Sequence, residues 1–150
     1  MTFGAHHYVP VLKVKGGEKT ALQKISPSVR EGITPLLEIV KRTDKALTAH
    51  LNTAFKRLPE SVSPYARCFL DARELEPDGP QAATEVFQRA SSAGMVFTPV
   101  TGISRTADVA AALGHRTHGL ALRLTRPEFE SGDLATNVEA FLGLHRLVPN

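Results

Sequence analysis

Charged side chains stand at the ends of four of the five apolar segments in this sequence, and a threonine ends the remaining one. In chain order these residues are Lys13, Lys15, Glu38, Asp71, Arg73, Thr101 and Arg123. A partly buried charge needs a partner of opposite sign, because burying an isolated charge costs several kcal/mol. The pattern therefore predicts a polar pocket in which carboxylates and cations face one another.

The residue types in this pocket suggest two kinds of chemistry. The predicted roles are catalytic for Glu38 and Asp71, anion-binding for Lys13, Lys15 and Arg123, and supporting for Arg73 and Thr101. Two neighbouring carboxylates can do general acid and base work or hold one divalent metal, and cations can hold an anionic group. The sequence itself identifies no cofactor. An alternative stays open, since apolar runs also end where a chain meets solvent and charges there can simply be hydrated.

Established motifs for phosphate loops, dinucleotide sites, zinc proteases and serine nucleophiles are absent from the sequence. The turn at residues 15–18 can cradle an anion at a helix start, although a plain strand-to-helix turn is the favoured interpretation. The histidines do not have the spacing of zinc ligands. Cys68 lies within an apolar segment, so we expect a buried and unreactive thiol.

The scaffold for these residues is a series of alternating strands and helices. Apolar segments predict strands at residues 8–14, 33–40, 66–71, 95–100 and 119–124. Helical spacing of apolar residues predicts helices at residues 18–25, 43–58, 82–94, 104–113 and 133–147, with polar loops at 73–80 and 126–130. Such alternation implies a parallel sheet with right-handed crossovers. The fold class is therefore α/β, built from five consecutive βα units.

Two architectures share this order of elements. An open doubly wound sheet can be complete with five strands, whereas a (β/α)8 barrel needs eight strands and about 250 residues. Periodicity alone does not separate them, and both bind ligands at the carboxyl ends of the strands. Pro10 suggests a first or edge position for its strand, because proline has no N–H to donate to a neighbouring strand.

Composition indicates a single domain covering residues 1–150, with residues 1–7 as a flexible tail. Hydrophobic residues make up 42% of the chain, enough for a proper core. The formal charge of +3 comes without a Lys/Arg-rich block, which argues against nucleic-acid binding and weakly favours anionic ligands. The sequence has no membrane-spanning run, no signal peptide and a single cysteine, so we expect a cytoplasmic protein.

Several segments resemble the phage-type "beta protein" family. Residues 8–18, followed by Ala21 and Leu22, and residues 33–39 are similar to its N-terminal signature. Three later segments, at residues 69–71, 98–102 and 122–124, fit its pattern in the same order. The resemblance implies a TIM-like barrel with Lys13, Lys15, Glu38, Asp71 and Arg123 around its mouth.

Members of that family are longer chains, so the resemblance implies a match to their N-terminal portion only. Five βα units are the first five-eighths of a (β/α)8 barrel. Three explanations stay open: a truncated gene product, a fragment, or half of a split barrel. Open strand edges predict self-association or a partner that completes the barrel.

The resemblance supplies no activity, and two hypotheses of function stay open. One is an enzyme or enzyme segment that binds a small anionic ligand, phosphorylated or nucleotide-like, at the strand ends. The other is a non-enzymatic, phage- or defence-associated interaction module that uses the barrel as a scaffold. A nucleic-acid binder, which needs a basic face, is a third and less favoured alternative.

Overall fold

The computed structural model describes residues 4–148, and its strands form one parallel sheet in the order β1-β2-β3-β4-β5. The strands are β1 (Val11–Lys13), β2 (Leu36–Glu38), β3 (Cys68–Asp71), β4 (Phe97–Thr101) and β5 (Ala121–Leu122). The predicted α/β class with five parallel strands is confirmed. β1 lies at an edge, as Pro10 predicted: the Pro10 carbonyl accepts from the backbone N–H of Leu36, and Pro10 has no N–H of its own.

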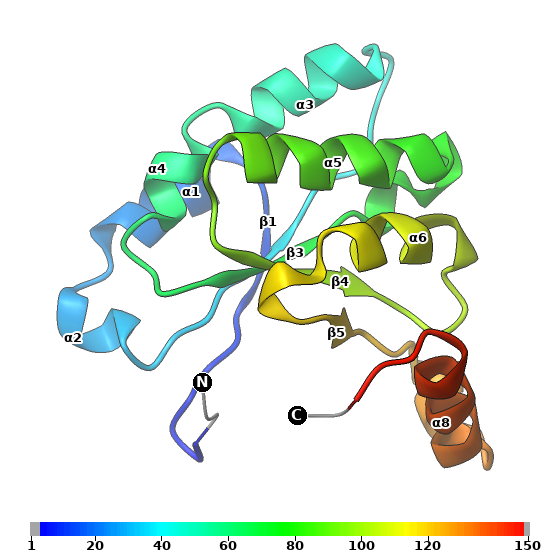
Figure 1. The fold of residues 1–150 in the computed structure, drawn as a ribbon. Helices are drawn as coiled ribbons and strands as arrows, with labels where there is room; N and C mark the ends of the chain where they lie inside the picture. Colours follow the sequence, from blue (N-terminus) through cyan, green and yellow to red (C-terminus); the bar gives the residue numbers. More distant parts are fainter. Residues whose placement is uncertain (1–3, 149–150) are drawn as a thin grey trace.

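One face of the sheet is covered by helices of the first four βα units (Figure 1). The helical elements are α1 (Gly16–Lys24), α2 (Pro27–Arg30), α3 (Leu47–Phe55), α4 (Leu58–Val62), η1 (Arg73–Asp78), α5 (Pro80–Ser92), α6 (Thr106–Gly114), η2 (Arg116–His118), α7 (Arg126–Glu130) and α8 (Leu134–Leu144). Figure 1 shows α1, α3, α4, α5 and α6 on the same side. Consecutive parallel strands that pair in chain order place their helices in this way, because the crossovers share one hand.

The strand order bears on the choice between the two predicted architectures. A doubly wound sheet reverses its order at a switch point, where its ligand binds. The strands of residues 4–148 show no reversal. Each neighbour in the sheet is also the next strand in the sequence, which is the order of successive strands in a βα-barrel. Closure into a TIM-like barrel stays a prediction.

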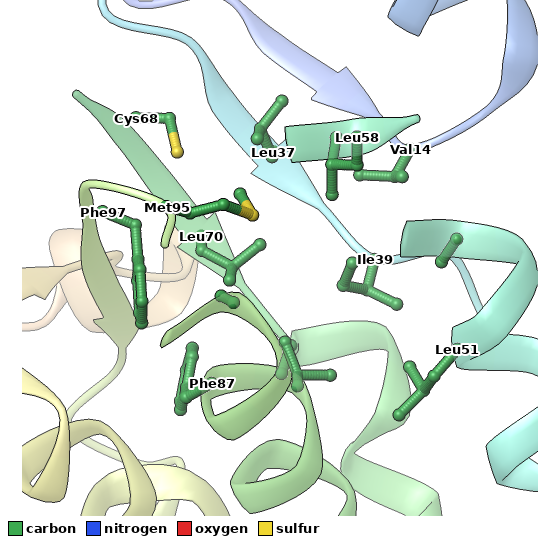
Figure 2. Packing of buried hydrophobic residues seen from close by; sticks show 14 of the residues in the cluster. Val14, Leu37, Ile39, Leu51, Leu58, Cys68, Leu70, Phe87, Met95 and Phe97 are labelled. Carbon is green, nitrogen blue, oxygen red and sulfur yellow. The ribbon is translucent and has the colours of Figure 1, made fainter. Parts of the chain in front are cut away.

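The hydrophobic core lies between the sheet and the helices (Figure 2). Side chains alternate along an extended chain, so Leu37 of β2 and Ile39, which directly follows β2, both face the helices and are almost fully buried. Phe87 of α5 stacks on Phe97 of β4 with ring centroids 6.0 Å apart. Cys68 belongs to the same core, and burial raises the pKa of its thiol to about 12. The predicted buried thiol is confirmed, and it is protonated at neutral pH.

The helix predicted at residues 43–58 is wrong in its start and in its continuity. The first helix here begins at Leu47, with Ala46 as the N-cap, and neither predicted capping residue serves. Arg57 then adopts a left-handed conformation with φ 62°, which ends helical geometry for one residue. A second helix, α4, starts directly after it with Pro59 in its first turn, where a missing N–H does no harm.

Two segments predicted as polar loops are helical. Residues 73–78 form the 3-10 helix η1, and residues 126–130 form α7. In α7 the Thr125 side chain accepts from the backbone of Glu128, while the Glu128 carboxylate accepts from the backbone of Thr125. This reciprocal capping box stabilises a helix of only five residues. The T-x-x-E spacing was visible in the sequence, but the surrounding polarity favoured a loop.

Two other helix predictions need correction. The cap predicted at Ser104 or Thr106 is wrong, because Arg105 occupies the N-cap position of α6 and makes no side-chain cap bond. The apolar stripe predicted to be buried on the last helix is also incomplete. Phe141 of α8 is buried, whereas Leu144 is 78% exposed.

The predicted tail at residues 1–7 falls partly outside the described residues, which begin at residue 4. Within it, the Nε2 atom of His7 lies 2.9 Å from the Thr34 hydroxyl, at the start of the second βα unit. None of the helices in residues 4–148 is long and apolar enough to cross a membrane.

Candidate functional site

Glu38 and Asp71 lie side by side at the carboxyl ends of β2 and β3, because the parallel register pairs them directly. The same register places Lys13 on the other side of Glu38, with the Lys13 Nζ 3.5 Å from Glu38 Oε1. Arg123, the residue after β5, reaches across β4 toward both carboxylates. Its Nη1 atom lies 2.6 Å from Glu38 Oε2 and 2.8 Å from Asp71 Oδ2. Four predicted site residues thus meet in one place.

Asp71 is the centre of this cluster and is completely buried. Its Oδ1 atom accepts a hydrogen bond from the Arg73 backbone N–H at 2.9 Å and another from Arg105 Nη2 at 2.7 Å. Its Oδ2 atom accepts from Arg123. Three donors therefore replace the water that the carboxylate loses on burial, which is the condition for burying a charge.

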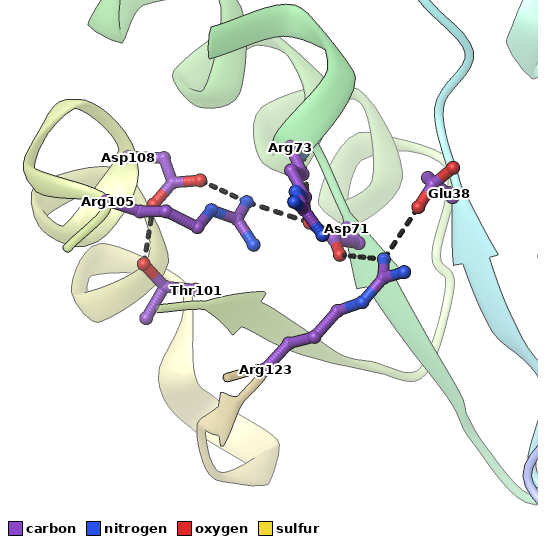
Figure 3. A network of polar contacts seen from close by, with 7 residues as sticks. All are labelled: Glu38, Asp71, Arg73, Thr101, Arg105, Asp108 and Arg123. Carbon is purple, nitrogen blue, oxygen red and sulfur yellow. Dashed lines mark hydrogen bonds and ion pairs between the residues drawn. The ribbon is translucent and has the colours of Figure 1, made fainter. Parts of the chain in front are cut away.

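Arg105 extends the cluster toward α6, as Figure 3 shows. Its Nη2 atom donates to Asp108 as well as to Asp71. The Thr101 hydroxyl, at the end of β4, donates to Asp108 Oδ1 at 2.5 Å. The Arg105 side chain is 5% exposed, yet its Nε and Nη1 atoms find no hydrogen-bond partner among residues 4–148. Two buried donors on a charged group are thus left unused.

The charged network, as we call it, consists of Lys13, Glu38, Asp71, Thr101, Arg105, Asp108 and Arg123. Cations and carboxylates alternate along it, so three charges of each sign balance. Burial opposes the charge of Arg123, but hydrogen bonds and charges from Asp71 and Glu38 outweigh it and raise the pKa of its guanidinium. The solvent-facing members are Lys13 and Arg123, whose side chains are 52% and 27% exposed.

Three other predicted residues have different positions. Lys15 lies outside the charged network, in a cleft beside the start of α1. Arg73 contributes its backbone N–H to Asp71, and in residues 4–148 its side chain makes no hydrogen bond or ion pair. Thr101 joins the charged network through its hydrogen bond to Asp108, which was not among the predicted residues, and its supporting role stays a prediction.

A divalent metal at Glu38 and Asp71 stays a prediction. Arg123 donates to both carboxylates, so a metal between them would have to displace its guanidinium. No group of three or more His, Cys, Asp or Glu side chains within residues 4–148 is arranged to hold a metal ion.

Gly102 and Glu128 fix the position of the loop that carries Arg105. A Cβ atom at Gly102 would lie 2.8 Å from Arg105 Cδ and 3.1 Å from the Arg123 carbonyl oxygen, so the close approach requires glycine. Glu128 accepts from the backbone N–H groups of Thr125 at 2.6 Å and Ser104 at 3.1 Å. The bonds from Thr125 and Ser104 lower the pKa of Glu128 to about 2. Glu128 thus ties α7 to the loop that carries Arg105.

Sequence reasoning missed Arg105 and Asp108. It searched the ends of the strands, where alternation predicts which side chains share a face. Arg105 instead follows β4 in a loop, and Asp108 lies in the first turn of α6. The usable signal was their spacing, because residues three apart on a helical turn can form an ion pair.

The fold and this site define an α/β protein whose parallel sheet carries a buried, charge-balanced network at its carboxyl edge. The chain belongs to the Beta protein family, which it matches over residues 8–148. This confirms the family resemblance, while the phage association and the match to an N-terminal portion only stay predictions. No curated protein and no solved structure matches the chain.

Proposed function

We propose that this protein binds a small anionic ligand at the carboxyl edge of its sheet, over Arg105 and Arg123. The observation that carries the proposal is the pair of unpartnered donors, Nε and Nη1, on the buried Arg105 guanidinium. Native structures rarely leave buried donors unused, and such groups often mark a binding function. A carboxylate or phosphoryl oxygen would satisfy them.

Arginine suits this role because its planar guanidinium matches carboxylate and phosphate groups in a bidentate manner. Asp71 and Asp108 fix the position of Arg105 before any ligand arrives, which lowers the entropy cost of binding. Arg73 follows Asp71 directly, and its uncommitted side chain adds a positive charge beside a network that is otherwise neutral.

The network favours binding over catalysis. Both oxygens of Asp71 accept hydrogen bonds, and Glu38 faces Arg123 and Lys13. Arg123 donates to an oxygen of each carboxylate, so acid and base work there would first require Arg123 to move away. We therefore propose that Glu38 and Asp71 position the arginines, and their catalytic roles stay predictions.

Calorimetric titration with malonate, a small dicarboxylate, tests the proposal. We expect the native chain to bind it with a Kd of about 1 mM or tighter at low salt. Arg73→Gln and Arg123→Gln should each weaken binding by about tenfold, the value of one charged hydrogen bond. Arg126→Gln removes the same charge from an exposed residue outside the network and should bind as the native chain does.

Arg73→Gln keeps this test decisive, because its side chain has no partner whose loss would unfold the protein. If both Arg73→Gln and Arg123→Gln bind malonate as tightly as the native chain, the anionic ligand does not occupy this edge.

The exposed apolar groups favour a second candidate function, an interaction module that associates with itself or with a partner. Val11 is exposed on the edge strand β1, Tyr8 is exposed in the segment just before it, and Leu144 is exposed on α8. Unpaired strand edges readily pair with another chain. Sedimentation equilibrium should therefore show a dimer or higher species that shifts toward monomer in Val11→Lys. A monomer at all concentrations would count against this candidate.

A further inference from the structure

A second cationic site lies on the helix side of the sheet, where β1 and β2 end. It is a cleft of about 270 Å³. The non-aliphatic residues that line this lysine cleft are Lys15, Gly16, Lys19, Lys41, Thr43, Lys45, His50 and Thr53. Its apolar wall includes Val14, Val40 and Ala54. We propose that the lysine cleft binds the diphosphate group of a phosphorylated ligand.

The residues that line the cleft carry only positive charge, while Glu18 in the first turn of α1 is the acidic residue at that helix start. None of the residues that line the cleft is an aspartate or a glutamate. Lys15, Lys41 and Lys45 are exposed, and in residues 4–148 none of their ammonium groups forms an ion pair. Lys13, at the end of β1, is by contrast paired with Glu38. Like charges gathered around a hollow raise the local concentration of anions.

Hydrogen bonds hold the walls of the cleft in place. The Lys19 ammonium donates to the carbonyl oxygens of Ala54 at 3.1 Å and Lys56 at 2.8 Å, at the C-terminal end of α3. Burial, together with nearby Arg57 and Lys56, lowers the pKa of Lys19. His50 Nε2 lies 2.9 Å from the Val40 carbonyl oxygen, to which it donates. The cleft is thus a fixed structure between α1 and α3.

The loop that carries Lys41 and Lys45 is also anchored. Arg42 lies between them and donates through Nε to Asp78 Oδ1 at 2.8 Å, which ties this loop to the end of η1. Arg42 Nη1 also donates to the carbonyl oxygen of Lys45 at 2.9 Å. The two lysines are therefore presented from a restrained backbone.

Backbone donors add to the lysines. The helix α1 has nine residues and begins at Gly16, and no side chain caps its N-terminus. The first N–H groups of a helix have no partner within it and attract anions. Gly16 lines the cleft, and a Cβ atom placed on it would meet nothing within 4 Å, so the approach to the backbone is open.

The number of donors and the size of the cleft point to a diphosphate. Three free ammonium groups together with a helix N-terminus balance about three negative charges, more than a single phosphate carries near neutral pH. A volume of 270 Å³ is below the range of about 300–1,000 Å³ for sites that enclose whole drug-sized ligands. The cleft therefore suits the diphosphate itself, with the rest of the ligand outside.

Calorimetric titration of the full chain with inorganic pyrophosphate tests this site. We expect the native chain to bind pyrophosphate about tenfold more tightly than inorganic phosphate, and the double variant Lys41→Gln/Lys45→Gln to lose about tenfold or more of that affinity. Lys24→Gln removes one charge from an exposed residue of the same α1 helix, outside the cleft, and should bind pyrophosphate as the native chain does.

Gly16→Pro adds a test of the backbone contact. Proline fits the first position of a helix and removes one N–H, so the variant should stay folded by circular dichroism and bind pyrophosphate more weakly. The proposal fails if Lys41→Gln/Lys45→Gln binds as the native chain does, or if Lys24→Gln loses as much affinity as the double variant. Arg123→Gln should keep pyrophosphate affinity, so this test and the malonate test can fail independently.

Discussion

Arg123 donates a hydrogen bond of 2.8 Å to Asp71, and this contact spans the strand that lies between them in the sheet. Because Arg123 follows the edge strand β5 and Asp71 ends the central strand β3, one side chain ties the edge of the sheet to its centre. Arg105 approaches Asp71 from the loop that precedes α6 and donates to its other oxygen. A single buried carboxylate therefore holds two arginines at the carboxyl edge.

Removing Arg105 should destabilise the protein strongly. Arg105→Met would leave Asp71 without one of its donors and Asp108 without its cation, both at buried positions. We expect a loss of about 3–5 kcal/mol in the free energy of unfolding, as for other broken buried ion pairs. Urea denaturation measures it, and Arg116→Met, an exposed position, serves as the control. Equal stability of the two variants would show that the buried pairs contribute nothing.

Gly102→Ala should also destabilise the fold, by about 1–3 kcal/mol, because the added methyl group meets both Arg105 and the Arg123 backbone. Gly114→Ala is the matched change. A methyl group there meets nothing within 4 Å, and replacing a helical glycine should stabilise by about 0.5–1 kcal/mol. Thermal melts of the two variants should therefore shift in opposite directions, and a shared direction would count against the close approach at Gly102.

The hydrogen bonds by which Glu128 ties α7 to the loop of Arg105 predict that the stability of the protein depends on pH. Its pKa falls from 4.5 to about 2 on folding, so the unfolded chain binds this proton more readily than the folded one. The contribution of Glu128 is complete above pH 4.5 and disappears as the pH falls toward 2. The stability difference between the native chain and Glu128→Gln should therefore shrink over that window. If the stability difference between the two chains stayed constant from pH 6 to about pH 2, it would contradict the stabilising role of the Glu128 hydrogen bonds.

Sequence reasoning reached the α/β class and the meeting of Lys13, Glu38, Asp71 and Arg123, because strand alternation and parallel register are regular. It failed to predict the site residues that extend from a loop or from the first turn of a helix. Arg105 could not be placed from sequence, since its direction depends on the close approach at Gly102.

Lys15 shows a second limit of the same reasoning. Its place after β1 suggested the same pocket as Lys13, two residues earlier. The chain turns into α1 at Gly16, however, and Lys15 lies with the lysines of the β2–α3 loop. The separation of two cationic sites at one edge therefore depends on turn geometry, which residue spacing does not encode.

The most direct test of the anion site is the nitrogen-bound proton signal of Arg105 Nε, followed by nuclear magnetic resonance in the ¹⁵N-labelled chain. Addition of malonate to about 10 mM, tenfold above a Kd of about 1 mM, should shift this signal to a saturating value. At the same malonate concentration the signal of Arg73→Gln should shift only about half of the full distance, because a Kd weakened tenfold to about 10 mM leaves about half of the sites empty. A signal that malonate leaves unchanged in the native chain would contradict the account, because the unpartnered donors of Arg105 would then bind no anion.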